Sequence, residues 1–136
     1  MCSISGIING DLKSLVKMID LQSHRAPDES GYYKNKNIFI GMGRLKIIDL
    51  KSQNLCPYED DKIVLSYNGE IYNYLELRKE LKSYNWKFKT SSDIEVLANS
   101  WKQWGYKMFQ KLNGMFAFCI YDKKKKYNFI GKRYCR

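Results

Sequence analysis

The segment Met115–Tyr121 is almost continuously apolar, and this feature constrains the fold of the chain more than any other. A run of that kind predicts a buried strand. Tyr127–Ile130 predicts a second buried strand, and the lysine run 123–126 between them is typical of a solvated turn. We therefore expect two buried strands that are joined by an exposed, basic turn.

Shorter apolar patterns predict the remaining strands and helices. Strands are expected at residues 3–9, 31–33, 38–41 and 62–67, and around Phe88. Helices are expected after the cap residue Asp11, from Tyr74, and after Ser92, which begins a capping box with Glu95; a short helical piece is expected at 108–112. Helices near both ends of a set of short, mostly antiparallel strands indicate an α+β layered domain.

Two polar stretches interrupt these elements. Residues 51–61 are irregular and predict a loop. The pair Asn68-Gly69 follows a strand directly, whereas Tyr74, Leu77 and Leu81 after it lie on one helical face. Because an Asn-Gly pair usually marks a turn, we expect it to lead from strand into helix. Its backbone N–H groups and the asparagine amide would then be available for other contacts.

Length and composition set the class of protein. A chain of 136 residues, 44% of them hydrophobic, suits one globular domain with its own core. The net charge of +10 would suit nucleic acid or an anionic membrane, but the lysines are spread over the whole sequence. No apolar stretch approaches the roughly 20 residues of a membrane span, and the pattern of a signal peptide is absent. A basic nucleic-acid-binding α+β module stays open as an alternative.

The cysteines and the histidine limit the chemistry. Cys2, Cys56, Cys119 and Cys135 form no CxxC pair, and His24 is the single histidine. This spacing makes a zinc site unexpected, and we predict no metal. A Ser-His-Asp or Cys-His centre could use only that one histidine. Free cysteines in a chain without an export signal indicate a reducing cytoplasm.

Cys2 sits directly behind the initiator methionine, and its small side chain predicts that Met1 is removed. The new chain end would carry a thiol and a free α-amine on the same residue. An α-amine titrates at about pH 8, far below a lysine, so a useful fraction is an unprotonated base at neutral pH. Such an amine can activate the nucleophile of its own residue. The alternative is a buried structural cysteine in an apolar first strand.

Six segments together carry a resemblance to one family. They are, in chain order, Met1–Gly6, His24–Gly31, Gly43–Leu50, Asn68–Tyr74, Ser92–Val96 and Asn113–Phe118. In this order they resemble the glutaminase domain of the class II glutamine amidotransferases, and most closely the N-terminal part of glutamine-dependent asparagine synthetases. The resemblance covers nearly the whole chain, from Met1 to about Gly131.

The resemblance implies an N-terminal-nucleophile hydrolase fold, a four-layer αββα sandwich of two antiparallel sheets between helical layers. It implies a glutamine amidotransferase type 2 domain at residues 1–131 and a divergent tail at 132–136. After Gly131 the family continues with an Arg-Asp pair and further strands, so we expect a truncated domain that lacks its last strands. Ala26 replaces a glycine of the family and Lys46 a small residue. If the backbone at the first position needs a positive φ, we expect a shifted loop there, and we expect crowding of the pocket at the second.

The resemblance also implies hydrolysis of the glutamine side-chain amide to glutamate and ammonia. Cys2 would attack the amide carbon, and its α-amine would pass the proton to the leaving ammonia. The side-chain amide of Asn68 and the backbone N–H of Gly69 would hold the oxyanion. Arg44 would bind the α-carboxylate and Asp93 the α-ammonium group. The remaining wall of the pocket would be formed by Leu45, Ile47, Ile48 and Glu70.

The resemblance implies no cofactor in this domain, because the ATP and Mg²⁺ of the family would belong to a synthetase domain that this sequence does not contain. The implied partners are L-glutamine and a synthetase domain or subunit that receives the ammonia, with neither nucleic acid nor membrane involved. A catalytically inactive, truncated remnant is the main alternative. At the level of residues, Asn68-Gly69 could be an ordinary turn, Asp93 a first-turn helix residue beside its cap, and Arg44 a surface arginine.

Overall fold

The computed structural model describes residues 2–53 and 55–133. The expected removal of Met1 and the end of the expected tail, residues 134–136, lie outside the described residues. The strand β7 (Tyr127–Arg133) runs two residues past the boundary that we expect after Gly131. That boundary stays a prediction.

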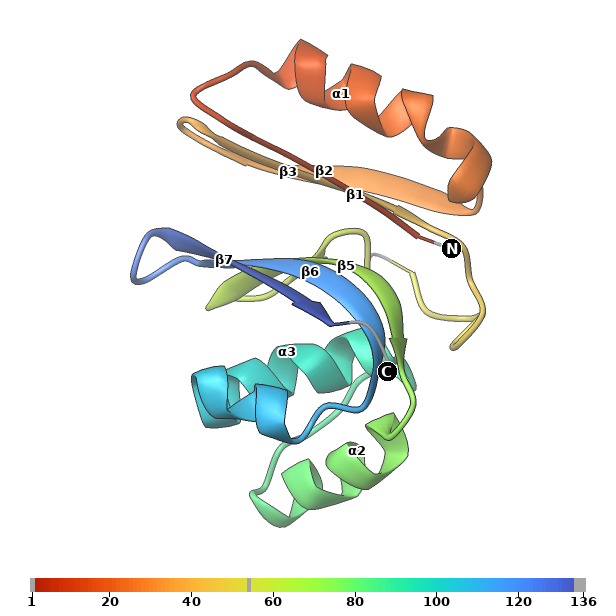
Figure 1. The fold of residues 1–136 in the computed structure, drawn as a ribbon, viewed down its shortest axis with the longest axis vertical. Helices are drawn as coiled ribbons and strands as arrows, with labels where there is room; N and C mark the ends of the chain where they lie inside the picture. The colour runs from red at the N-terminus through yellow and green to blue at the C-terminus, as the bar shows by residue number, and fades with distance from the viewer. Residues whose placement is uncertain (1, 54, 134–136) are drawn as a thin grey trace.

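Across the described residues the strands form two antiparallel sheets that lie face to face (Figure 1). The first has the order β1 (Ser3–Ile8), β3 (Ile38–Arg44), β2 (Glu29–Asn35). The second has the order β4 (Tyr58–Glu59), β5 (Ile63–Ile71), β6 (Gly114–Asp122), β7. The sheets meet through Ile40 of β3 and Val64 and Tyr121 of the second sheet, all three buried.

Helices cover the two outer faces of this pair of sheets. Helix α1 (Leu12–Leu21) lies on the first sheet, and α2 (Tyr74–Ser83) and α3 (Asp93–Trp104) lie beyond the second (Figure 1). Two 3-10 turns, η1 (Ser23–Arg25) and η2 (Gly105–Gln110), follow α1 and α3. The expected α+β fold with the layer order αββα is confirmed.

Local sequence explains α1 directly. The Asp11 carboxylate accepts a hydrogen bond from the backbone N–H of Ser14 at 2.9 Å, which satisfies one of the free donors of the first turn. Leu15 and Ile19 point inward and pack on Phe39 of the first sheet. The cap and the apolar spacing are therefore sufficient to predict this helix.

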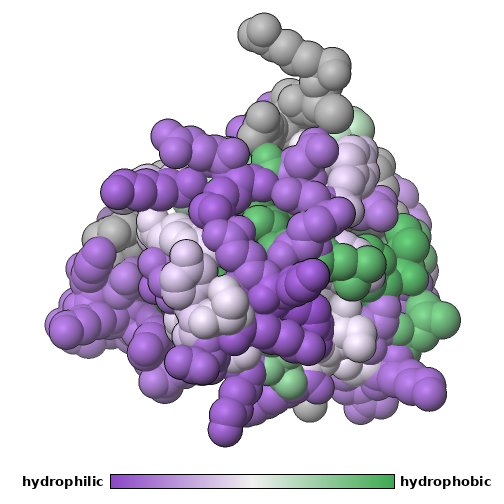
Figure 2. Space-filling view, turned by 90° about the horizontal axis from the view of Figure 1, so that it is seen from below, coloured by the Kyte–Doolittle hydropathy of each residue, from purple (hydrophilic) through white to green (hydrophobic). Residues whose placement is uncertain are grey.

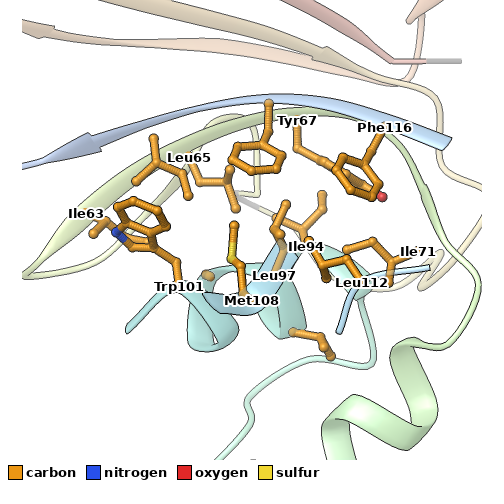
Figure 3. Close-up of a cluster of buried hydrophobic side chains, with 14 of the residues drawn as sticks. Ile63, Leu65, Tyr67, Ile71, Ile94, Leu97, Trp101, Met108, Leu112 and Phe116 are labelled. Atoms are coloured by element: carbon orange, nitrogen blue, oxygen red, sulfur yellow. The ribbon is translucent and has the colours of Figure 1, made fainter. Parts of the chain in front are cut away.

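The main core lies between the second sheet and α3 (Figure 3). Leu65 of β5 and Leu97 of α3 are fully buried there, and Met108 of η2 closes the cluster. The helix begins at its Ser92 cap, whose Oγ accepts from the backbone N–H of Ile94 at 3.1 Å. Burial of every α3 residue from Asp93 to Trp101 makes this helix the centre of the larger cluster.

The expected turn at Asn68-Gly69 is wrong, because β5 continues through both residues to Ile71. Gly69 pairs with Phe116 of β6, and its φ of +149° is one that L side chains rarely adopt. A Cβ at Gly69 would lie 2.5 Å from the Phe116 Cα. The glycine therefore permits close approach of two strands rather than a change of direction.

Three other local expectations need correction. Phe88 lies outside any strand and packs instead under the Arg78 guanidinium, 4.3 Å from its ring centre. The capping box does not form, because the Glu95 carboxylate turns away from Ser92 and accepts from the backbone N–H groups of Lys89 and Thr90. The loop at 51–61 contains the two residues of β4.

The side of the molecule that carries α2 is mostly hydrophilic, with smaller hydrophobic areas (Figure 2). The lysine run 123–126 is the turn between β6 and β7, as expected, and Lys123 pairs with Glu59 at 2.6 Å. Within the described ranges, no helix is long and apolar enough to span a membrane, and no three His, Cys, Asp or Glu side chains gather as metal ligands would.

Substitution of Gly114 by alanine tests the close approach of β5 and β6. Its φ is +155°, and a Cβ there would overlap the carbonyl oxygen of Glu70 on the neighbouring strand. We expect Gly114→Ala to lower the free energy of unfolding by about 4 kcal/mol or more. Gly105→Ala is the control, because Gly105 also has a positive φ but an open surrounding; it should cost about 1–2 kcal/mol. Equal losses in urea unfolding would contradict the strand-contact argument.

Candidate active site

A cavity of about 210 Å³ opens where the residue before β1, the loop after β3, β5 and the start of α3 come together. All nine residues named from the sequence lie on its wall: Cys2, Arg44, Leu45, Ile47, Ile48, Asn68, Gly69, Glu70 and Asp93. These residues come from four segments that lie far apart in the chain. The fold thus brings the set together, while the role of each member stays a prediction.

Cys2 occupies the end of the first sheet, just before β1. Its side chain is half-buried, and the thiol lies 3.9 Å from the carbonyl oxygen of Leu45. Burial disfavours the thiolate and raises the pKa of the Cys2 thiol above its usual value. A nucleophile at this position therefore needs a base to take its proton.

Asn68 and Gly69 reach the cavity from β5. Successive strand residues point to opposite faces, and Ser66 Oγ donates to the Gly41 carbonyl of the first sheet at 2.8 Å. Asn68 shares that face and points between the sheets. Its buried Oδ1 has no hydrogen-bond partner among the described residues. Buried polar groups are nearly always paired, so the acceptor capacity of this amide oxygen is left unused by the fold.

Asp93 lies at the first position of α3 and is only 5% exposed. The Tyr67 hydroxyl donates to its Oδ2 at 2.7 Å, and the backbone N–H of Ile71 donates to the same oxygen at 3.4 Å. Burial outweighs these hydrogen bonds and raises the pKa of the Asp93 carboxyl. A buried carboxylate in a cavity wall can receive a cationic group of a ligand.

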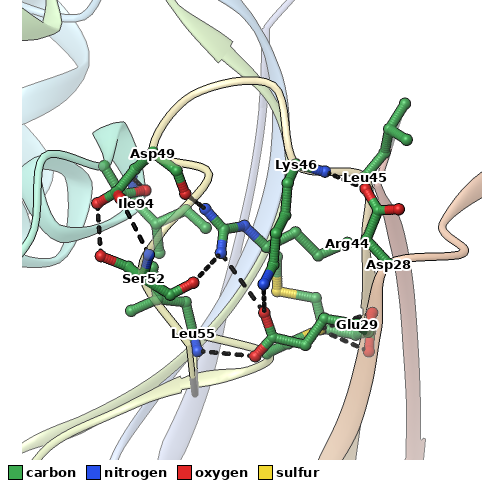
Figure 4. A network of polar contacts seen from close by, with 12 residues as sticks. Asp28, Glu29, Arg44, Leu45, Lys46, Asp49, Ser52, Leu55 and Ile94 are labelled. Atoms are coloured by element: carbon green, nitrogen blue, oxygen red, sulfur yellow. Dashed lines mark hydrogen bonds and ion pairs between the residues drawn. The ribbon is translucent and has the colours of Figure 1, made fainter.

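Arg44 is 2% exposed, and its guanidinium is directed into the loop that follows β3 (Figure 4). Nη2 donates to the carbonyl oxygens of Ile48 and Asp49, at 3.0 and 3.1 Å. Nη1 donates to the carbonyl oxygen of Ser52 at 3.1 Å and to Glu29 Oε2 at 3.5 Å. The surface-arginine alternative is therefore wrong, since the side chain holds a loop from within.

The same loop is fastened at a second point by Asp49 (Figure 4). Its carboxylate accepts from the backbone N–H of Ser52 at 3.1 Å and from the backbone N–H of Ser91 at 2.7 Å. The second bond connects the loop to the segment just before α3. Leu45, Ile47 and Ile48 thereby become a fixed part of the cavity wall, although the Ile47 side chain is 67% exposed.

Two departures from the family pattern, Ala26 and Lys46, lie near the site. Ala26 has a φ of −141°, so its backbone does not require glycine. The Lys46 ammonium lies 3.7 Å from Glu29 Oε2 and the residue is not part of the cavity wall. The expected crowding of the pocket by Lys46 is therefore wrong, whereas the shifted loop at Ala26 stays a prediction.

Sequence reasoning missed several residues of the cavity. Tyr67, Tyr72, Ser92, Ile94 and Met115 also line it. Strand alternation could have placed Tyr67 on the face of β5 that meets α3. No local signal could have assigned its partner, because Tyr67 and Asp93 are 26 residues apart in the chain.

Comparison with known proteins gives one consistent family. The family described as a glutamine amidotransferase domain matches residues 1–133. Asparagine synthetase (glutamine-hydrolyzing) 1 of Bacillus subtilis is 38% identical over 132 residues, which are 90% of this chain and 21% of that protein. Asparagine synthetase B (glutamine-hydrolyzing) of Escherichia coli is 37% identical over 139 residues, 97% of this chain and 25% of that protein.

The chain spans a fifth to a quarter of the length of these relatives. Among solved structures, the glutamine phosphoribosylpyrophosphate amidotransferase of B. subtilis, complexed with ADP and GMP, aligns with a TM-score of 0.48 at 27% identity. The alignment covers 65% of this chain and 22% of the other.

Arg44→Lys tests how the loop is held. A lysine ammonium cannot reproduce the planar fork that meets four acceptors, so loop carbonyls lose their donors. We expect a loss of about 2 kcal/mol in unfolding free energy and faster tryptic cleavage after Lys51 in the loop. Arg25→Lys, at an exposed position at the end of η1, should change neither by more than about 0.5 kcal/mol. Unchanged cleavage in Arg44→Lys would show that Arg44 is dispensable for the loop.

Asp93→Asn tests the cost of the buried charge. A carboxyl whose pKa is raised on folding destabilises the fold at every pH above that pKa, because the unfolded chain ionises more easily. We expect the asparagine variant to be more stable than the parent at neutral pH, with a gain that shrinks as the pH falls through the Asp93 pKa. Urea unfolding at several pH values measures this, and the exposed Asp20→Asn serves as control. A gain that does not change with pH would contradict the assignment.

Proposed function

This chain belongs to the family of glutamine amidotransferase domains, and from that premise we propose that it hydrolyses L-glutamine to glutamate and ammonia at the cavity beside Cys2. The observation that carries the proposal is the convergence of Cys2, Asn68, Gly69, Asp93 and Arg44 on one cavity wall. This reaction requires a nucleophile, donors for an oxyanion, and opposite charges for the α-ammonium and α-carboxylate groups of the amino acid.

The nucleophile is the Cys2 thiol, and its base is the α-amine that removal of Met1 would expose. The amine takes the thiol proton as sulfur bonds to the amide carbon, and it then gives the proton to the nitrogen that leaves as ammonia. Water attacks the resulting thioester and releases glutamate and the free thiol. The raised pKa of the Cys2 thiol supports the need for this local base.

The oxyanion of each tetrahedral step is held by the side-chain amide of Asn68 and the backbone N–H of Gly69. Support comes from the position of both residues on the cavity wall.

Asp93 receives the α-ammonium group of glutamine, and Arg44 supports its α-carboxylate. The Arg44 nitrogens already donate to loop carbonyls and to Glu29. We therefore assign Arg44 a long-range attraction and the holding of the loop, in place of the two-pronged contact implied by the resemblance. Glu70 and the loop residues 45–48 complete the wall around the substrate.

The ammonia would pass to a synthetase domain or subunit, because the relatives at 37–38% identity are named asparagine synthetases and this chain spans a fifth to a quarter of them. Hydrolysis itself would need no cofactor, since the thiol, the amine and the oxyanion donors supply its steps. ATP and Mg²⁺ would serve the synthetase. The cytoplasm suits the proposal, because a reducing compartment keeps the thiol of Cys2 free.

Glutamate release from L-glutamine by the purified, untagged chain tests the proposal. We expect Cys2→Ala to lower the rate by about a thousandfold or more, because no other cysteine of the described residues lies on the cavity wall to form the thioester. Cys119→Ala is the matched control, since its thiol lies in β6 outside the cavity wall. Release that persists in Cys2→Ala, or a folded parent chain that releases no glutamate, would contradict the proposal. The second result would favour the inactive-remnant alternative.

A further inference from the structure

Tyr67 is a buried residue of the cavity wall whose hydroxyl has no place in the chemistry described above. It is 2% exposed and lies on the face of β5 that meets α3, within the main core (Figure 3). Its hydroxyl donates to Oδ2 of Asp93 at 2.7 Å. A core position needs only the ring, so the hydroxyl calls for a separate explanation.

We infer that Tyr67 is a positioning residue, whose hydroxyl holds the Asp93 carboxylate in the orientation that receives the α-ammonium group of glutamine. The inference rests on the proposed function, because it assigns a ligand group to Asp93. It concerns recognition of the substrate and leaves the steps at Cys2 unchanged.

The hydrogen bond has a fixed direction. Burial and the neighbouring carboxylate hold the pKa of Tyr67 far above its usual range, so the phenol keeps its proton and acts as the donor. The backbone N–H of Ile71 donates to the same oxygen at 3.4 Å. Two donors on one oxygen restrict rotation of the carboxylate plane. A held carboxylate loses less conformational freedom when the ligand binds.

The arrangement also connects the two ends of the substrate through one strand. Tyr67 and Asn68 are consecutive in β5 and point to its opposite faces. Asn68 serves the amide that reacts, and Tyr67 serves the carboxylate that would hold the amino group. Because both depend on the same pair of residues, the separation of the reacting end and the amino end is set by β5 itself.

Tyr67→Phe removes the hydroxyl and keeps the ring, so it separates the hydrogen bond from core packing. The test uses the full chain with Cys2→Ala, which prevents turnover, and ligand-observed NMR, which reads weak binding. Two ligands are compared: L-glutamine, and glutaramate, which lacks only the α-amino group. We expect Tyr67→Phe to weaken glutamine binding by about tenfold, the value of one charge-assisted hydrogen bond, and to leave glutaramate binding unchanged.

Tyr121→Phe is the matched control. Tyr121 is also 2% exposed, lies on the adjacent strand β6, and its hydroxyl accepts from Asn35 Nδ2 at 3.3 Å, outside the cavity wall. Loss of that hydroxyl should leave the affinity for both ligands unchanged. The pH dependence gives a second readout. Removing a donor raises the Asp93 pKa further. As the pH is lowered, Tyr67→Phe should therefore lose glutamine binding at a higher pH than the parent does.

Equal weakening of both ligands in Tyr67→Phe would overturn the inference, because it would indicate general damage to the cavity. Unchanged glutamine binding, or a parent that binds no glutamine, would overturn it as well. Failure of the proposed function is read separately, from the absence of glutamate release by the chain that retains Cys2. A chain that binds glutamine with the expected pattern but releases no glutamate would keep Tyr67 in its role and remove the enzyme claim.

Discussion

The pairing of β5 with β6 is the constraint on which the rest of the structure depends. It extends over nine residue pairs, from Ile63 opposite Asp122 to Ile71 opposite Gly114. Gly69 and Gly114 leave room for the two backbones where a Cβ would collide with the opposite strand. One face of β5 carries the core above α3 and the other faces the first sheet. The candidate site lies at the end of this ladder, so its geometry follows from the register of the two strands.

Two buried charges set the energetic character of the cavity. Arg44 and Asp93 are 2% and 5% exposed, and isolated charges at such depth are costly. Carbonyl oxygens of the loop and Glu29 offset the cost for Arg44, whereas Asp93 keeps a raised pKa despite two donors. The remaining cost at Asp93 falls where a cationic ligand group would remove it. Under the proposed function, stability and recognition would therefore be in opposition at this residue.

The layer order and α1 could be predicted from the sequence, because the Asp11 cap and the spacing of Leu15 and Ile19 are local signals. The strand conformation of Asn68-Gly69 could not be predicted, since an Asn-Gly pair usually forms a turn and only the pairing with β6 keeps it in a strand. The resemblance named nine residues of the cavity wall, and their roles stay predictions. Tyr67 was missed because its hydrogen bond to Asp93 exists only in the assembled fold.

The central claim is that Cys2 is a nucleophile aimed at the amide carbon of glutamine, and labelling with a glutamine analogue that carries a diazoketone in place of the amide tests it most directly. Peptide mass mapping would locate the label and show whether Met1 precedes the labelled residue. The account predicts a label on Cys2 at the chain end, and slower labelling when L-glutamine is present. The buried Cys56 should stay unmodified. Labelling that glutamine does not slow, or that falls on other cysteines as readily, would contradict it.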